Sequence, residues 1–340
     1  MGGYAKVWLC RDLAAPTPKY VALKILMAEA STEDCRELMC AEQLKSTMVA
    51  EETRPICAPL RQFGTDRPNG SHLCFVYPVL GPKVFSGLLG FSKDLDTALR
   101  GVCHEIAKAM ALLHALGICH GGLEDLPEEK VLEVLGKPQT TAAVENTRQP
   151  HQLSTAPPYL VYPVSWRSVD KHYFSNTPCV TDFGEAFKCT DRWALGCTLF
   201  EIRAFSPFDD DDDSYLDAMV ETLGIMPEPW WSTIWEGRAQ VYVDEPDELG
   251  RAVLVREEEQ RGKGANATYH PSAAQGAHSL QEKLTAGVWY MSDDAPEAAH
   301  RDIPPVEAKL FADLLGQLLR WKAEERVSAE KPLSHKWFQL

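Results

Sequence analysis

Two stretches near the middle of the chain decide the fold: CVTDFG at Cys179–Gly184 and DRWALGC at Asp191–Cys197. The first is a short apolar segment, typical of a buried strand, that runs into a turn carrying a carboxylate. Considered alone, the DFG tripeptide is equally compatible with an ordinary turn after a buried strand. The second stretch opens the apolar segment Trp193–Ile202, whose spacing predicts a buried helix. A strand, an acidic turn and a core helix therefore follow one another closely.

Length and composition indicate a globular protein with a large core. The chain has 340 residues, of which 45% are apolar and 9% aromatic. Its 34 basic and 49 acidic residues give a formal charge of -15. That charge disfavours non-specific binding to nucleic acid or anionic membranes, and it suits basic protein partners.

The cysteines and the apolar runs predict where the protein works. Ten cysteines without a CxxC spacing, and no apolar leader at Met1, indicate free thiols in a reducing compartment. They imply no metal cluster. The longest apolar runs, such as residues 107–119, are too short and too interrupted to cross a bilayer. We therefore expect a soluble intracellular protein of the cytoplasm and/or the nucleus.

The first part of the chain is β-rich. Lys6–Cys10 and Tyr20–Leu26, separated by the turn-like AAPTP at Ala14–Pro18, predict a hairpin, and Ser71–Leu80 predicts a further strand. Between them, residues 32–49 have helical spacing with Thr32 or Ser31 as the N-cap. The apolar positions of this helix share one face: Leu38, Ala41 and Leu44.

The rest of the chain is mainly helical. Leu95–Leu116 predicts a strongly apolar helix that ends at Gly117, and amphipathic helices are expected around Phe311–Trp321 and Lys331–Phe338. An insert near residues 123–175 is polar and interrupted by prolines, apart from a short helical piece at Glu128–Leu135.

Two further polar segments are expected to be irregular. The acidic run Asp209–Asp213 predicts a loop, because such runs are usually solvated. Residues 255–285 contain few large apolar side chains and much Gly, Ala, Gln and charge, which predicts mobility.

Two segments near the start resemble protein kinases. Met1–Val7 (MGGYAKV) resembles their glycine-rich loop, and Val21–Lys24 (VALK) resembles their lysine strand. The family implies that small residues let backbone NH groups approach the phosphates of ATP, while apolar residues cover the adenine. Considered alone, glycines beside a start methionine are also compatible with a frayed terminus. The implied ATP-binding residues of these segments are Gly2, Gly3, Val7 and Ala22.

Lys24 closes an apolar strand, so it must either snorkel to water or have a partner. The candidate partners on the helix over residues 32–49 are Glu37 and Glu42. We favour Glu37, because Arg36-Glu37-Leu38 followed by Leu44 resembles the family's Glu-Ile-x-x-Leu-x-x-Leu pattern. The resemblance implies that this ion pair positions the lysine on the α and β phosphates.

The strand Leu73–Val79 resembles the hinge of the family, with Tyr77 as gatekeeper and Pro78, Val79 and Leu80 facing the base. Proline lacks an NH but keeps its carbonyl, which is the group that adenine needs at that position. The NH is then supplied by Leu80. Adenine recognition is therefore expected to be retained.

The stretches quoted first resemble the family as well. In CVTDFG, the resemblance makes Asp182 the ligand of a magnesium ion that bridges the β and γ phosphates of ATP. DRWALGC resembles the start of the central helix of the large lobe. Further likeness lies at Phe208, at Pro229–Trp231 and over residues 319–338.

The general base and one metal ligand of the family's phosphoryl transfer are missing. Leu112–Gly121 (LLHALGICHG) resembles the entry to the catalytic loop, LH-x-x-x-I-x-H-G-D, but Gly122 stands where the general base should be. Pro127 stands where an Asn should hold a second magnesium. Asp125 is a candidate surrogate base, with an N-cap or surface acid as its alternative role.

A deletion explains this gap better than a substitution does. Gly121–Leu126 and Glu128–Gly136 resemble the sequence that follows the catalytic loop in fungal members of the SR-protein-kinase-like family, a CMGC-type group. A second deletion follows the DFG. Asp191 comes only nine positions after Asp182, whereas the family's activation segment and Ala-Pro-Glu element need several tens of residues.

The resemblance implies an α+β, bilobal kinase-like fold with a small β-rich lobe at residues 1–80 and a larger helical lobe at 81–340. The family transfers the γ-phosphate of ATP to Ser or Thr, often in Arg/Ser-rich proteins. Three hypotheses follow: a working kinase with surrogate groups, a pseudokinase that binds nucleotide or a partner, and an incomplete version of an active kinase. Losses at three separate landmarks favour the third: the glycine-rich loop begins midway, and the catalytic loop and the activation segment are missing. We expect ATP binding without efficient catalysis.

Overall fold

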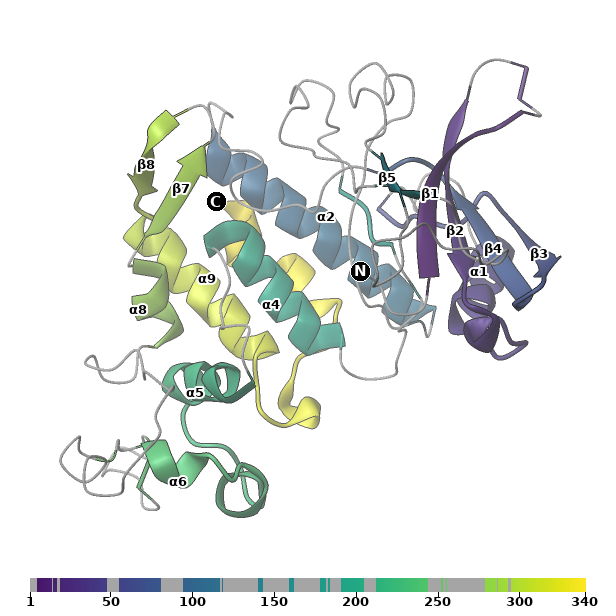
Figure 1. Cartoon of the computed structure of the whole chain (residues 1–340). Coiled ribbons are helices and arrows are strands. Elements are labelled where there is room, and N and C mark those ends of the chain that lie inside the picture. The colour runs from purple at the N-terminus through teal and green to yellow at the C-terminus, as the bar shows by residue number, and fades with distance from the viewer. Residues whose placement is uncertain are drawn as a thin grey trace. The chain divides into compact units, whose positions relative to one another are not determined.

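The computed structural model describes a chain of class α+β, with a small antiparallel sheet and many helices (Figure 1). Contacts divide it into a first unit, residues 1–84 and 112–187, and a second unit, residues 85–111 and 188–340. The expected bilobal arrangement and the boundary at residue 80 stay predictions. The residues described are 5–13, 15–16, 19–47, 55–80, 94–116, 118, 140–142, 159–161, 178–181, 183, 191–204, 212–243, 252, 255, 279–285, 287–292 and 295–340.

The first unit is built on a four-stranded antiparallel sheet in the order β1-β2-β4-β3 (Figure 1). The predicted hairpin is confirmed, and the third predicted strand forms but ends at Tyr77 instead of Leu80. Strand β3 was not predicted, because its sequence RQFGTDR shows no apolar alternation. Asn69-Gly70 signals the turn into β4, and Gly70 has the positive φ of 123° that favours glycine. The strands are β1 Ala5–Arg11, β2 Tyr20–Leu26, β3 Arg61–Arg67 and β4 Gly70–Tyr77.

Helix α1 covers Arg36–Thr47 and begins later than the predicted residue 32. The prediction of Ser31 or Thr32 as its N-cap is wrong. The Ser31 hydroxyl instead donates to Met27 O (2.8 Å) and accepts from the Leu73 backbone N–H (2.8 Å), which ties the chain before the helix to β4. The predicted apolar face is confirmed: Ala41 and Leu44 are buried, and Leu38 packs against the core.

The core of the first unit joins the sheet to the segment before the DFG. Only a single parallel bridge, from Val180 to Ile56, forms there among the described residues, where a strand was expected. Within the expected insert, β5 Thr140–Ala142 pairs with β6 Tyr159–Val161. The helical piece predicted at residues 128–135 lies outside the described residues. The buried core residues are Leu26, Cys35, Cys57, Phe75, Tyr77 and Cys179.

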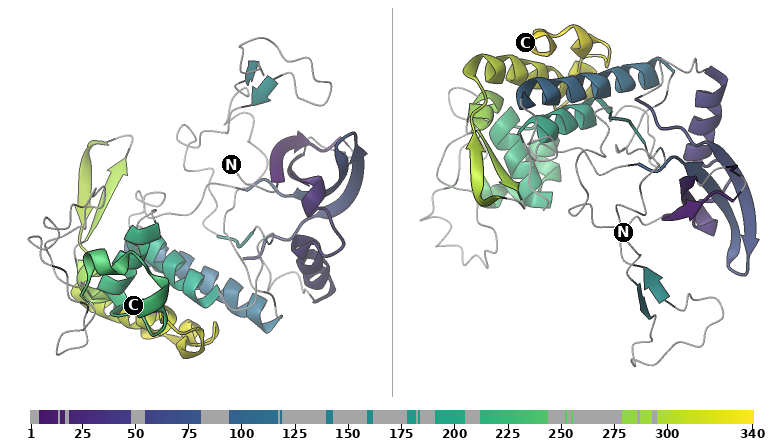
Figure 2. Two further views of the ribbon diagram at one scale, coloured as in Figure 1. Left: turned by 60° about the horizontal axis from the view of Figure 1, so that its bottom comes forward. Right: turned by 90° about the horizontal axis from the view of Figure 1, so that it is seen from above.

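The second unit is mainly helical, and its helix α4 packs on α9 (Figure 2). The two strongest helix predictions are confirmed by α2 Leu95–Ala115, whose residues 95–111 belong to this unit, and by α4 Asp191–Ala204. Helix α9 covers Pro305–Leu318, beginning before the predicted Phe311. A hairpin of β7 Val288–Ser292 and β8 Ala295–Arg301 was not predicted.

Three predictions for this unit are wrong in part. Asp212 and Asp213 of the expected acidic loop form the start of helix α5, Asp212–Leu223, because helix N-termini favour acidic residues. Part of the segment expected to be mobile forms α8, Leu280–Thr285, in which Leu280 and Leu284 are buried. A capping box supports this helix: Ser279 Oγ accepts from Glu282 N (3.3 Å), and Glu282 Oε2 accepts from Ser279 N (2.6 Å).

The third is the helix expected at residues 331–338, which consists of two 3₁₀ turns, η8 Lys331–Ser334 and η9 Lys336–Gln339. Extended backbone at His335 interrupts them. Short helical turns complete the unit: η6 Trp230–Ile234, α6 Arg238–Val241 and η7 Ala323–Glu325. In the part of the chain that the structure describes, no helix has the length and apolarity needed to span a membrane.

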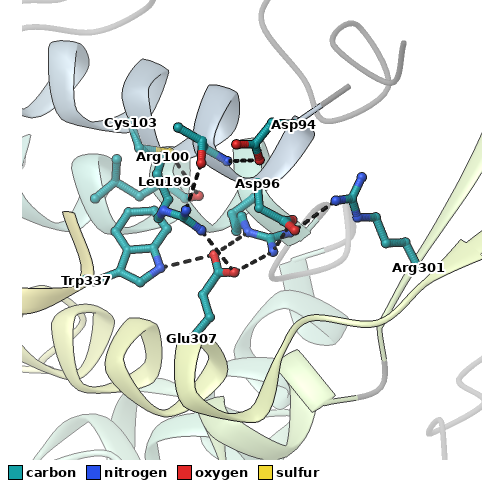
Figure 3. Close-up of polar contacts among 10 residues, drawn as sticks. Asp94, Asp96, Arg100, Cys103, Leu199, Arg301, Glu307 and Trp337 are labelled. Atoms are coloured by element: carbon teal, nitrogen blue, oxygen red, sulfur yellow. Dashed lines mark hydrogen bonds and ion pairs between the residues drawn. The ribbon is translucent and has the colours of Figure 1, made fainter. Parts of the chain in front are cut away.

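A buried ionic network holds the helices of the second unit together (Figure 3). Arg203 on α4 is fully buried and binds Glu307 on α9 through Nε (2.8 Å) and Nη2 (3.0 Å). Its Nη2 also donates to Asp96 on α2 (2.8 Å), which Arg301 reaches from β8 (2.8 Å). Each carboxylate thus bridges elements that are distant in sequence.

Glu307 is the acceptor at the centre of this network. Arg100 Nη1 lies 3.3 Å from Glu307 Oε2, and Trp337 Nε1 donates to Glu307 Oε1 at 3.3 Å. Burial alone would raise the pKa of Glu307. The hydrogen bonds and charge of Arg203, together with the charge of Arg100, outweigh burial and hold that pKa below its ordinary value. The network therefore stabilises the fold through an ionised Glu307.

We predict that Glu307→Gln lowers the free energy of unfolding by about 3 kcal/mol at pH 7, because it removes the negative charge and one of the two acceptor oxygens that face buried guanidinium groups. The folded-state pKa is depressed, so the contribution is present above the unfolded pKa of about 4.3 and is lost as pH falls through the folded pKa. The difference in the free energy of unfolding between wild type and variant should therefore narrow as the pH falls below about 4.

Chemical denaturation over a pH series measures this gap. Glu105→Gln is the matched control, because Glu105 on α2 is half-exposed and, among the described residues, its ion pair is with Lys108 at 2.7 Å. Its effect should stay within about 0.5 kcal/mol. A gap between wild type and Glu307→Gln that widened on acidification would contradict the assigned role.

Candidate functional site

One face of the sheet in the first unit gathers the residues expected to hold nucleotide. In the antiparallel register, Val7 lies opposite Lys24, and Lys24 lies opposite Phe75. Two residues before Lys24 on β2, Ala22 lies opposite Tyr77. Side chains two residues apart on a strand point to the same face of the sheet, so one face carries Val7, Lys24, Phe75, Ala22 and Tyr77. Phe75 is fully buried, whereas Val7 is 64% exposed. The face therefore runs from a packed core to an apolar side chain in solvent, with the lysine between them.

Lys24 and Glu37 form the predicted ion pair. Lys24 Nζ donates to Glu37 Oε2 at 2.8 Å, and the two side chains are 12% and 1% exposed. Glu37 lies in the first turn of α1, on the same face as the buried Ala41 and Leu44, which turns its carboxylate toward the sheet. Glu42 is exposed. The preference for Glu37 over Glu42 as the partner of Lys24 is confirmed.

Tyr77 has a contact that sequence reasoning missed. Its hydroxyl donates to Glu37 Oε1 at 2.6 Å, so the two carboxylate oxygens are bound by a lysine from β2 and a tyrosine from β4. A buried carboxylate without such partners would be strongly destabilising. The sequence offered one clue, because a tyrosine inside an otherwise apolar strand needs an acceptor for its hydroxyl. The gatekeeper role of Tyr77 stays a prediction.

Residues 78–80 follow directly after Tyr77, the residue of β4 that lies opposite Ala22. Val79 is buried, and Pro78 and Leu80 are half-buried. Ala22 and Leu80 both pack against the core cluster of the first unit. The expected hinge residues thus follow directly after the last pair of β2 and β4, in which Ala22 lies opposite Tyr77. Their contacts with adenine remain a proposal.

The segment predicted to bind metal is described only at the flanks of Asp182. Val180 is held by hydrogen bonds to both neighbours of Ile56, with Cys57 N donating to Val180 O (2.7 Å) and Val180 N donating to Pro55 O (2.7 Å). Phe183 is buried at 1% exposure. The predicted magnesium ligand and several other predicted positions lie outside the described residues: Asp182, Gly2, Gly3, Gly122, Asp125 and Pro127.

The described residues contain no cluster of three or more His, Cys, Asp or Glu side chains that could hold a metal ion. No disulfide joins the cysteines in this part of the chain. The sheet face offers a fixed cation, Lys24, and a buried carboxylate, Glu37, that orients it. Apolar side chains lie on both sides of the lysine. Such a set suits an anionic ligand with a flat apolar part.

Curated relatives of this chain are serine/threonine protein kinases. Serine/threonine-protein kinase AFC3 of Arabidopsis thaliana is 22% identical over 355 aligned residues, which cover 99% of this chain and 80% of that protein. Two serine/threonine protein kinases of Aspergillus fumigatus are 30% identical over 121 residues, or 34% of this chain and 29% of each relative. No family model matches the chain. The similarities support membership of the protein kinase superfamily.

We predict that Tyr77→Phe lowers the free energy of unfolding by about 2 kcal/mol, because it removes a hydrogen bond to a buried, charged carboxylate oxygen. Chemical denaturation followed by circular dichroism measures the change. Tyr20→Phe is the matched control, since Tyr20 lies half-buried on β2 and its hydroxyl has no hydrogen bond among the described residues. Equal effects of the two variants would show that the bond to Glu37 does not stabilise the fold.

Proposed function

We propose that this relative of serine/threonine protein kinases binds ATP on the sheet face of its first unit and transfers phosphate inefficiently or not at all. The observation that carries the proposal is the ion pair between Lys24 and Glu37. A lysine on a strand normally has a mobile, hydrated ammonium group. Here a buried carboxylate, itself fixed by Tyr77, holds that ammonium in one place. A fixed cation is what the α and β phosphates need.

The apolar residues around Lys24 fit the base. Ala22 is small and leaves room beside the sheet, and Val7 keeps a solvent-exposed apolar surface on the same face. We assign both to the two sides of the adenine ring. The carbonyl of Pro78 and the N–H of Leu80 are assigned to its edge, where a planar base needs one acceptor and one donor. Gly2 and Gly3 complete the phosphate contacts.

Asp182 is the proposed ligand of magnesium, which when bound neutralises charge on the phosphates of ATP. The donor type fits, because magnesium prefers carboxylate oxygens and keeps several waters. The buried Val180 and Phe183 on either side support the assignment by anchoring the flanking backbone in the first unit. This chain's own contribution is to orient the nucleotide through Lys24 and Asp182.

Inefficient transfer follows from the residues at the catalytic loop. Gly122 cannot accept the proton of a substrate hydroxyl, and Pro127 cannot ligate a metal through a side chain. Placement among fungal SR-protein-kinase-like enzymes is part of the proposal, as is a basic intracellular protein partner, which the formal charge of -15 favours. The alternative is a pseudokinase that acts as a nucleotide- or protein-binding module, and the ATP experiment separates nucleotide binding from protein binding alone.

We predict that ATP with magnesium raises the melting temperature of the intact chain by a few degrees. One millimolar ligand against a Kd of about 100 μM contributes about 1.4 kcal/mol. Lys24→Met should abolish most of this ligand-induced shift, because the phosphates lose their cation. The shift is measured for each variant against its own ligand-free melt.

Lys45→Met is the matched control and should keep the full shift. Lys45 is an exposed lysine of α1 that donates to Gln62 Oε1 at 2.6 Å. A wild-type chain that melts cooperatively but shows no shift with saturating ATP and magnesium would refute nucleotide binding. A role in binding a protein partner alone would then replace it.

We further predict negligible phosphotransferase activity. Loss of the general base alone lowers turnover by about 100-fold to 10,000-fold. Transfer of radiolabelled γ-phosphate to an Arg/Ser-rich peptide, with magnesium present, should not exceed the signal of a Lys24→Met blank. Robust transfer that disappears in Asp182→Asn would overturn this expectation and restore a working kinase.

A further inference from the structure

The second unit contains a large aromatic pocket that the proposed ATP site does not use. Its volume is about 1060 Å³, at the upper end of the range for small-molecule sites. Helices α4 and α5, the turn η6 and the chain after α9 supply its walls. The residues that line it are Trp193, Leu216, Met219, Met226, Trp230, Ile234, Trp235, Glu236, Gly237, Gln240, Trp321 and Arg326.

Arg326 is the cation among these lining residues, and it is held rigidly. Its Cζ lies 5.1 Å from the centroid of the Trp193 ring. Its Nε donates to the carbonyl of Arg320 (2.8 Å), and its Nη2 donates to the carbonyl of Trp321 (3.1 Å). A guanidinium has five N–H groups, so these bonds leave Nη1 and one N–H of Nη2, which is the edge that binds a carboxylate with two parallel hydrogen bonds.

The charge of Arg326 is poorly compensated. In the described chain, no carboxylate lies within ion-pair distance of it, although the exposed Glu324 attracts it from further away. Burial and the neighbouring Arg192, whose Nη1 donates to Arg326 O (2.7 Å), both lower the pKa of Arg326. Burial also raises the pKa of the Cys197 thiol to about 12, so that group supplies no anion at neutral pH. An external anion would relieve this imbalance.

We propose that this pocket binds an organic carboxylate with a flat aromatic body, the carboxylate on Arg326 and the rings against the tryptophans of the pocket wall. Trp193 and Trp321 are stacked, with centroids 6.4 Å apart and planes at 28°, which gives the wall a flat surface. A phosphate dianion fits less well, because one guanidinium and apolar walls cannot replace its hydration. The exposed Glu236 adds one negative charge to the lining and disfavours ligands with several.

The test compares two probes on the intact chain, 2-naphthoate and its neutral analogue 2-naphthamide, by isothermal titration calorimetry. We expect the carboxylate to bind at least tenfold more tightly, because a hydrogen-bonded charge pair adds to the same ring contact. Arg326→Gln should remove the preference. Arg320→Gln should keep it, since the Arg320 side chain is exposed and only its backbone carbonyl contacts Arg326.

Equal binding of the two probes, or binding of neither, by the wild-type chain would overturn the proposal whatever the variants do. A preference that survives in Arg326→Gln would also overturn it, because another cation would then be responsible. If Arg326→Gln fails to fold, Trp230→Ala replaces it: Trp230 is 39% exposed, and its loss should weaken both probes several-fold. Unchanged binding in that variant would place the probes elsewhere.

Discussion

The first unit depends on one buried carboxylate, that of Glu37. It is 1% exposed, and an isolated ionised carboxylate there would be several kcal/mol unfavourable. Lys24 from β2 and Tyr77 from β4 each bind one of its oxygens, so burial is tolerated only when α1, β2 and β4 are all in place. The helix, the sheet and the orientation of the lysine are thus set by the same bonds.

The second unit has a buried carboxylate of its own, but that one has a different consequence. Glu307 is bound by Arg203, which is fully buried, so the cation is enclosed by protein and can only join helices. Lys24 instead shares a sheet face with Val7, which is mostly exposed. A buried carboxylate therefore supports a ligand site only where its cation borders an accessible surface. By this criterion we propose Glu37 as a positioning residue, whereas Glu307 is structural.

Sequence reasoning succeeded where a single physical constraint acted. The lysine that ends an apolar strand needed a partner, and helical spacing limited the choice to two glutamates, of which the structure selects Glu37. It failed where tertiary contacts override local preference: the Ser31 hydroxyl serves β4 rather than a helix N-terminus, and β3 forms because β4 offers it an edge. Asp182 and Gly122 lie outside the described residues, so their roles rest on sequence alone.

Fold and chemistry tolerate divergence to different degrees, so a chain can resemble kinases without performing their reaction, as we propose for this one. Cores accept substitutions that conserve volume and pattern, so 22% identity to a plant kinase over 99% of the chain is compatible with a shared scaffold. Catalysis requires particular atoms. Glycine in place of one carboxylate removes roughly 3 to 5 kcal/mol of transition-state stabilisation, and no redistribution of packing replaces it. A likeness in buried positions therefore supports binding more strongly than turnover.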